Sequence, residues 1–394
     1  MNFDNETYKI TDSKNTGILL IIVGVSVTIL SAIGYFSNSA QFFMSYLVAW
    51  IFWVSIGLGA LFFVMLNHLT GAVWSLVLRR INESVMIALP FMAILFVPLI
   101  FGLHDMYHWT HAEDVANDAI LSQKTGYLNV PFFLVRSAIY FIAWFLIAYK
   151  LYKTSITQDN NPTPDQIKAM RRVSGPGMVV FALTTSFAGF DWLMSLDAHW
   201  YSTIFGVYFF SGGLLSSLAL LVLIALYLRK KNILNEMITI EHYHDMAKLM
   251  FAFTIFWGYM AFSQYFLIWY ANSPEETIWY LHRWEGNWKI LSMTLVFGHF
   301  VIPFIGLMTR TAKRNLVWLT IISIWLIIMH WIDLYWIAMP TYAHHGFHLS
   351  WMDLSLLIGI GSVFIGIFWK FTSASAIVPV NDAALTQSIG FSNN

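Results

Sequence analysis

Long apolar runs alternate with short polar stretches along nearly the whole chain. A helix that crosses a bilayer needs about 20 predominantly apolar residues, and ten segments meet that requirement. Numbered 1–10 in chain order, these spans are residues 18–36, 42–66, 85–103, 130–152, 176–196, 203–228, 247–270, 288–308, 315–338 and 352–371. The pattern predicts an all-α integral membrane protein with ten transmembrane helices.

The composition of the 394 residues agrees with a membrane protein, since 58% are hydrophobic and 11% are charged. Soluble domains carry about 25% charged residues. A net charge of zero gives no reason to expect a nucleic-acid partner. Because the chain has no cysteine, it has no disulfide, no Cys-ligated zinc, no iron–sulfur cluster and no covalently attached haem.

Ten spans place both termini on one side of the membrane. Lys and Arg gather in the loops of that side, whereas the opposite loops carry only Lys124, Arg283 and Lys289. Because basic loops stay in the cytoplasm, we expect cytoplasmic termini, with an N-terminal segment 1–17 and a loosely ordered tail 372–394. The N-terminal segment lacks the basic region of a signal peptide, so span 1 is expected to be retained.

Two shorter helices are also expected outside the spans. Thr163, Pro164 and Gln166 fit the N-cap, N1 and N3 positions of a helix start, which predicts a short cytoplasmic helix before span 5. On the opposite side, segment 275–288 is expected to lie in the membrane interface.

An internal repeat relates residues 42–196 to residues 203–338. Span 2 contains SIGLGALFF and span 6 contains SGGLLSSLAL, so both have small residues that permit close helix contact. Span 5 ends FDWLM and span 9 ends IDLYW, which aligns Asp191 with Asp333. The repeat predicts two four-helix bundles, spans 2–5 and spans 6–9, flanked by spans 1 and 10.

Residues 176–213, PGMVVFALTTSFAGFDWLMSLDAHWYSTIFGVYFFSGG, read as a hairpin of two spans with one carboxylate inside the first. A charged side chain within a bilayer costs at least a few kcal/mol unless it is paired, hydrated or protonated. Asp191 therefore needs a partner or a proton. Arg136, inside span 4, is expected to pair with Asp191 or with Asp105.

Polar and titratable residues gather at one depth, below the face opposite the termini. Intramembrane residues of this kind commonly mark ion or substrate paths, although they can also simply hold helices together. The candidates for a proton path are Asp191, Asp333, His330, His299, Arg136, His104, Asp105 and His199. Gln264, Asp191 and Arg136 are candidates for a quinone pocket.

No metal site is expected, because HExxH-like clusters are absent. The segment His344-His345-x-x-His348 is interpreted as polar residues of a loop and not as metal ligands. His330 and Asp333 lie on one helix face and are expected to support each other. His299 and His330 lie on neighbouring spans, which leaves a b-type haem as an alternative.

The motif FDWLMSLDAHWYSTIFGVYFFSGG (190–213), the ten spans and the repeat resemble the F subunit of alternative complex III, a bacterial quinol:cytochrome c oxidoreductase. That subunit belongs with the NrfD/polysulfide-reductase-like membrane subunits. The resemblance implies a multi-pass subunit of the bacterial inner membrane, with a proton path or quinone-binding bundle beside the main quinol-oxidising subunit. It also implies menaquinol or another quinol as ligand, and as partners an NrfD-like sister subunit, c-type haem and iron–sulfur subunits, and lipids.

Two alternatives remain open. One is a purely structural subunit of such a complex. The other is a stand-alone secondary transporter with its substrate between the two repeats, although Pro90, Pro98 and Pro303 do not align between the halves as broken transporter helices would.

Overall fold

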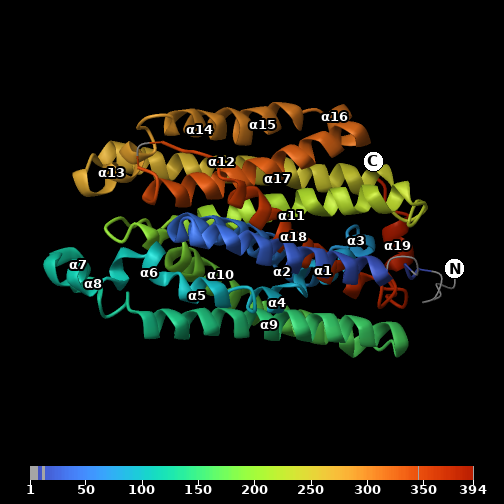
Figure 1. The fold of residues 1–394 in the computed structure, drawn as a ribbon. Coiled ribbons are helices and arrows are strands. Elements are labelled where there is room, and N and C mark those ends of the chain that lie inside the picture. Colours follow the sequence, from blue (N-terminus) through green and yellow to red (C-terminus); the bar gives the residue numbers. More distant parts are fainter. Residues whose placement is uncertain (1–7, 11–13, 345, 394) are drawn as a thin grey trace.

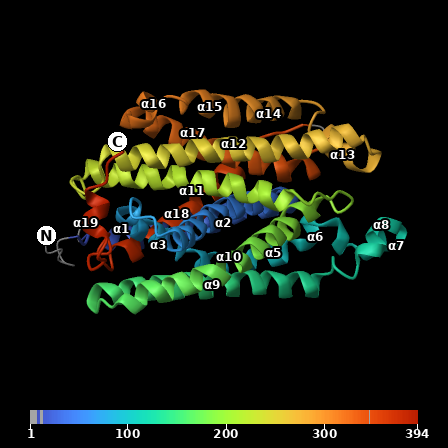
Figure 2. The same ribbon diagram turned by 180° about the vertical axis from the view of Figure 1, so that it is seen from behind.

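Helices make up every regular element of the described residues, which are 8–10, 14–344 and 346–393 in this computed structural model (Figure 1). Within these residues, ten helices or helix runs are long and apolar enough to cross a membrane. They lie roughly parallel to one another, as Figure 2 also shows from behind. The chain is an all-α integral membrane protein, as predicted.

The first bundle is formed by spans 2–5. Its helices are α2 (Ser39–Thr70), the broken run α3 (Leu76–Met86), α4 (Leu89–Met92), α5 (Val97–Phe101) and α6 (Leu103–Met106), then α9 (Val130–Asn160) and α10 (Pro164–Trp192). Pro90 and Pro98 stand at the starts of α4 and α5, where a ring without an N–H is tolerated. The third span begins earlier than predicted because the charged side chains of α3 interrupt its apolar run.

The second bundle is formed by spans 6–9. Its helices are α11 (Phe205–Lys230), α12 (Ile240–Ala271), the run α14 (Trp288–Thr294), η5 (Leu295–Val301) and α15 (Ile302–Gly306), and α17 (Leu316–Ala338). The η5 segment is a stretch of π-helix. A short α16 (Arg310–Arg314) joins α15 to α17. The tenth span, α18 (Trp351–Thr372), packs on α2, and α1 (Lys14–Ser31) packs on α18.

Both ends of the described chain lie at one end of the molecule, called here the terminal end (Figure 1). The opposite, distal end carries short helices in the loops. These are α7 (Ala112–Asn117) and α8 (Ala119–Lys124) beside the first bundle, and α13 (Pro274–His282) beside the second. A helix is thus present in the segment 275–288 as α13, although it ends earlier than predicted.

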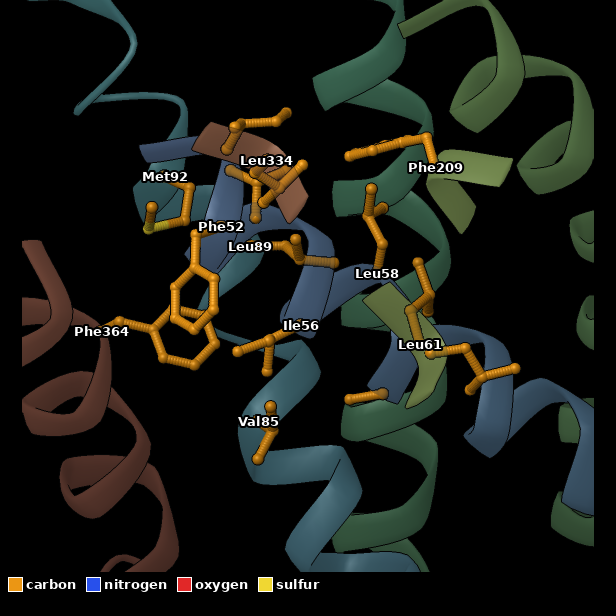
Figure 3. Close-up of a cluster of buried hydrophobic side chains, with 14 of the residues drawn as sticks. Phe52, Ile56, Leu58, Leu61, Val85, Leu89, Met92, Phe209, Leu334 and Phe364 are labelled. Carbon is orange, nitrogen blue, oxygen red and sulfur yellow. The ribbon is translucent and has the colours of Figure 1, made fainter. Parts of the chain in front are cut away.

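The two bundles meet along α2 and α11, whose small residues allow the backbones to approach closely. A Cβ atom on Gly59 would lie 2.5 Å from Ser217 Cβ, and one on Gly213 would lie 2.9 Å from the Ser55 carbonyl oxygen. Figure 3 shows the apolar core around this seam, with Phe52 and Leu58 of α2, Phe209 of α11 and Leu334 of α17. The small-residue stripes predicted in spans 2 and 6 therefore form the central contact.

Two local predictions are wrong. The first concerns the helix that begins at Pro164, which has the predicted capping box at Thr163 and Gln166 but continues through Pro176 to Trp192 as one helix. The short helix expected before span 5 is therefore the first part of that span, because a proline can kink a helix without ending it.

The second concerns the expected loosely ordered tail, which is instead packed against the terminal end. Ile377, Val378 and Leu385 are almost completely buried, and α19 (Leu385–Ile389) lies against α3. Asp382 reaches Arg79 Nη1 at 3.1 Å. Burial of these apolar side chains explains the packing, since it removes apolar surface from water.

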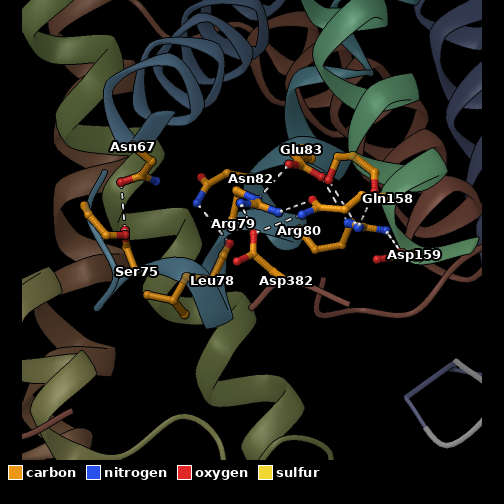
Figure 4. Close-up of polar contacts among 12 residues, drawn as sticks. Asn67, Ser75, Leu78, Arg79, Arg80, Asn82, Glu83, Gln158, Asp159 and Asp382 are labelled. Carbon is orange, nitrogen blue, oxygen red and sulfur yellow. Dashed lines mark hydrogen bonds and ion pairs between the residues drawn. The ribbon is translucent and has the colours of Figure 1, made fainter. Parts of the chain in front are cut away.

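A buried polar cluster holds the tail in place (Figure 4). Arg79 and Arg80 lie between Glu83 on their own helix, Asp159 on α9 and Asp382 of the tail, with ion-pair distances of 2.8–3.2 Å. Gln158 Oε1 accepts a bond from Arg79. The sequence pattern indicated these arginines only as loop charges that set orientation.

Candidate functional site

Arg136 of α9 and Asp191 of α10 form a bidentate ion pair inside the first bundle. Arg136 Nε lies 2.8 Å from Asp191 Oδ2, and Nη2 lies 2.9 Å from Oδ1. Tyr140 donates a hydroxyl bond of 2.6 Å to the same carboxylate. Arg136 also donates to the Tyr127 carbonyl and stacks on the Tyr127 ring, 3.8 Å from its centroid. Of the two partners proposed for Arg136, the structure selects Asp191.

This ion pair is sealed from its surroundings. Asp191 is fully buried and Arg136 is 6% exposed. Trp192, the next residue, packs on Trp50 and donates to Ser137 Oγ. Because both carboxylate oxygens and most guanidinium donors already have partners, the arrangement resembles a latch between α9 and α10.

Asp333 of α17 is the residue that the sequence repeat aligns with Asp191, but its partners are neutral. Tyr208 of α11 donates its hydroxyl to Asp333 Oδ1, and Trp257 of α12 donates Nε1 to Oδ2 at 3.1 Å. The carboxyl group is buried. The two aligned aspartates therefore differ in chemistry, since one faces a fixed cation and the other faces two neutral donors.

Two buried histidines lie near Asp333. The ring of His299, in the π-helical η5, stacks on Trp257 at 3.9 Å, and neither ring nitrogen has a hydrogen-bond partner among the described residues. His330 Nε2 lies 2.8 Å from Ser55 Oγ, whereas its Nδ1 is unpartnered there. The expected support of Asp333 by His330 is replaced by these other bonds. Buried polar atoms without partners are uncommon, and π-helical turns occur frequently at functional sites.

A crevice of about 1000 Å³ opens between α12 and the α14–η5 run, in the distal half of the second bundle. Its rim is apolar and exposed, with Tyr259, Phe262 and Val296 at 48–62% exposure. Its floor includes Tyr208 and Trp257, the two side chains that bond Asp333. The crevice therefore runs from the exposed apolar surface of the bundle to two side chains that bond a buried carboxyl group.

The polar lining of the crevice includes Gln264, Tyr280 and Arg283. Gln264 Nε2 donates to the Tyr280 hydroxyl at 3.2 Å, and its Oε1 accepts from Ser202 at 3.1 Å. Of the three residues predicted to contact a quinone, Gln264 is thus the one that lines this crevice. Asp191 and Arg136, the other two candidates, lie in the first bundle and do not line it.

Arg283 is a cation surrounded by carbonyl groups and aromatic rings. It donates to the carbonyls of Trp279, Trp336 and Ile337 and stacks on the Trp279 ring at 3.4 Å. The last carbonyls of a helix carry partial negative charge, so the end of α17 stabilises this cation. Burial lowers the pKa of Arg283 to about 9, which still leaves it charged at neutral pH.

The remaining candidates are exposed at the distal end, His104 and Asp105 on α6 and His199 in the loop after α10. His199 Nε2 is 2.6 Å from Asp118 Oδ2, and Asp105 Oδ1 accepts a bond from Ser39. The His104 carbonyl accepts a bond from His111. These residues do not join the buried groups, so the predicted layer separates into an ion pair, a crevice site and a set of loop contacts. Of the His344–His348 segment, residue 345 lies outside the described residues.

The sequence pattern did not indicate Tyr208, Trp257, Tyr280 and Arg283 as site residues. The three aromatic residues looked like the rest of an aromatic-rich chain. Arg283 did carry a signal, because a lone Arg among aromatics on the side with few basic residues is unusual.

Fold and site together define a polytopic helical membrane protein with a crevice whose rim is apolar and exposed and whose lining bonds a buried carboxyl group. No family model matches the chain, and no curated protein matches it either.

Proposed function

We propose that the chain is a membrane subunit of a respiratory quinol:cytochrome c oxidoreductase, and that its second bundle binds a quinol and accepts protons from it. The observation that carries this proposal is the crevice itself. It opens sideways, where a lipid-soluble quinol would enter, and two of its floor residues bond Asp333.

The lining suits a quinone head group. Ligand cavities of about 300–1,000 Å³ are mostly apolar with a few placed polar groups, and this crevice has that character. Aromatic rings flank the opening, and Gln264, Tyr280 and Arg283 offer polar contacts to ring oxygens. The isoprenoid tail would leave along the apolar rim formed by Phe262 and Val296.

Tyr208 is placed to relay a proton, because it lines the crevice and its hydroxyl already donates to Asp333. A quinol hydroxyl would give its proton to the Tyr208 oxygen as Tyr208 gives its own to Asp333. His330 and His299 would extend the path within the bundle. The electrons would pass to iron–sulfur and c-type haem carriers of partner subunits, since this chain has no cysteine.

Orientation supports release of these protons outside the cell. The basic loops lie at the terminal end, which would face the cytoplasm. The crevice lies in the distal half and would therefore be near the outer face of a bacterial inner membrane.

The contacts inside the first bundle favour a structural role for that bundle. Its matching carboxylate is held by Arg136 and Tyr140 and is fully buried. We propose that the first bundle stabilises the subunit and that quinol and proton chemistry belongs to the second.

Blocking the crevice tests the proposal. Val296→Trp places a large ring inside the opening, and Ile302→Trp is the matched control, since Ile302 is 44% exposed on the same helix run but does not line the crevice. The measurement is equilibrium binding of a short-chain menaquinone analogue to the complex purified in mild detergent.

We expect Val296→Trp to weaken binding at least tenfold relative to Ile302→Trp, because the analogue would lose its cavity. Equal affinity in both variants would show that the quinone binds elsewhere.

A further inference from the structure

Three potential metal ligands lie together at the distal end, outside the crevice and the ion pair. They are His108 of η3 (His108–Thr110), His111 at the N-cap of α7, and Asp114 in its first turn. One ligand atom from each lies within 4.8 Å of the others. The spacing His-x-x-His-x-x-Asp brings them to one side of a turn that joins two short helices.

The bonds around His111 orient its ring. His111 Nε2 lies 2.7 Å from the His104 carbonyl oxygen, which can only accept, so Nε2 carries a proton. The other nitrogen, Nδ1, lies 3.0 Å from Asp114 Oδ2. Histidines that bind metals commonly donate their second N–H to a carbonyl or carboxylate, which fixes the tautomer. Here the His104 carbonyl accepts the N–H of Nε2, and Nδ1 is the nitrogen directed at the Asp114 carboxylate.

We propose that His108, His111 Nδ1 and Asp114 form a binding site for a divalent transition-metal ion of the Zn²⁺ type. Two imidazoles and a carboxylate suit zinc, whereas Mg²⁺ and Ca²⁺ prefer oxygen ligands. This proposal differs from the expectation, drawn from the sequence, that the chain has no metal site.

The site is open to solvent on one side. The side chains of His111 and Asp114 are 30% and 54% exposed. Zinc sites with three protein ligands keep a fourth position for water or another group. The ring of His104 lies 4.0 Å from that of His111, centroid to centroid.

Binding would tie η3 to α7, within the loop that connects the third and fourth spans. The ion would replace the proton between His111 Nδ1 and Asp114 Oδ2, and that proton would go to solvent. Because the ion would link residues on both sides of the turn, residues 108–117 should become more resistant to local opening.

Zinc titration of the complex tests the site. After removal of metal by a chelator and then of the chelator, Zn²⁺ binding is measured by competition with a fluorescent zinc indicator, for wild type and for His108→Ala, His111→Ala and Asp114→Ala. The matched control is His199→Ala, which removes another distal histidine that bonds a carboxylate, Asp118. Because every variant is measured in the same kind of complex, zinc bound by partner subunits contributes equally to each measurement.

We expect each of the three cluster variants to lose one zinc ion per chain, or to bind it at least about tenfold more weakly, whereas His199→Ala matches wild type. Hydrogen exchange of residues 108–117 should slow on adding Zn²⁺ to wild type and stay unchanged in the Asp114→Ala variant. The proposal is overturned if wild type binds no more zinc than the cluster variants, or if His199→Ala loses as much.

Discussion

Asp191 and Asp333 are aligned by the sequence repeat and have different partners. Asp191 faces Arg136 in a bidentate pair, whereas Asp333 accepts from Tyr208 and Trp257. A guanidinium group holds a carboxylate through two charge-assisted hydrogen bonds, which are stronger than hydrogen bonds from neutral donors. At the scale of single residues, this difference supports the proposal that Asp191 stabilises the fold and that Asp333 exchanges protons.

The latch role of Asp191 predicts a large loss of stability on its removal. Asp191→Leu leaves Arg136 buried without its carboxylate, which should destabilise the protein by about 3–5 kcal/mol. Thermal unfolding of the detergent-solubilised protein measures the change. The double variant Arg136→Met with Asp191→Leu should recover most of it, because replacing both charges removes the unpaired cation. A double variant as unstable as the single one would contradict this role.

The proposed proton role of Asp333 predicts that its substitution slows turnover without weakening quinone binding. Asp333→Asn keeps the shape of the side chain but cannot accept the proton. Proton transfer by a positioned side chain contributes about 10²–10⁴-fold to rate, so quinol-dependent electron transfer should fall at least tenfold while affinity for the quinone analogue changes little. Full turnover in this variant would remove Asp333 from the proton path.

At the scale of elements, two features position the site. They are the small-residue seam between α2 and α11 and the π-helical turn of η5. The seam brings Ser55 of α2 within 2.8 Å of His330 on α17. The π-helical turn places His299 against Trp257. Close helix approach and one widened turn therefore arrange the buried polar groups.

The seam makes a prediction for Gly59. In Gly59→Ala the added Cβ would lie 2.5 Å from Ser217 Cβ, so α2 and α11 must separate. Overpacking of this kind costs about 1–3 kcal/mol, which should lower the unfolding temperature. Gly126→Ala is the control, since a methyl group added there would meet nothing within 4 Å and the change should be nearly neutral. Equal effects of both substitutions would mean that the seam is not tightly packed.

The sequence predicted these elements well where hydrophobicity decides them. All ten spans were found, and the stripes SIGLGALFF and SGGLLSSLAL indicated the close contact that α2 and α11 make. A carboxylate partner for Arg136 could be predicted because buried charges in a bilayer need partners, but the choice of Asp191 over Asp105 could not. Tyr208 and Trp257 could not be assigned to Asp333, since aromatic residues are frequent throughout this chain and no local pattern indicates their partner.

At the scale of the whole molecule, the tail after α18 holds the terminal end together. It reaches α3 through Asp382 and α9 through Asn381, which donates to the Asp159 carbonyl. It also reaches α12, where His242 Nε2 lies 3.0 Å from the Ser388 carbonyl oxygen. The sequence did not indicate this packing, because a short segment of small residues has no helical or strand period.

Loss of Asp382 tests the tail contact. Asp382→Ala leaves Arg79 with Glu83 and Gln158, and should lower the unfolding temperature and expose residues 374–393 to proteases. Asp165→Ala is the matched control, because its carboxylate is 91% exposed and its 3.8 Å ion pair with Lys168 should contribute little. Unchanged proteolysis in Asp382→Ala would show that apolar packing alone holds the tail.

Labelling with a photoreactive quinone analogue tests the central claim most directly. The complex in native membranes is irradiated with an azido-menaquinone, and labelled peptides are identified by mass spectrometry, with and without an excess of unlabelled quinone. We predict competed labelling of α12 and of the α14–η5 run, around Phe262 and Val296. Competed labelling confined to other subunits would contradict the account and leave this chain without a quinone site.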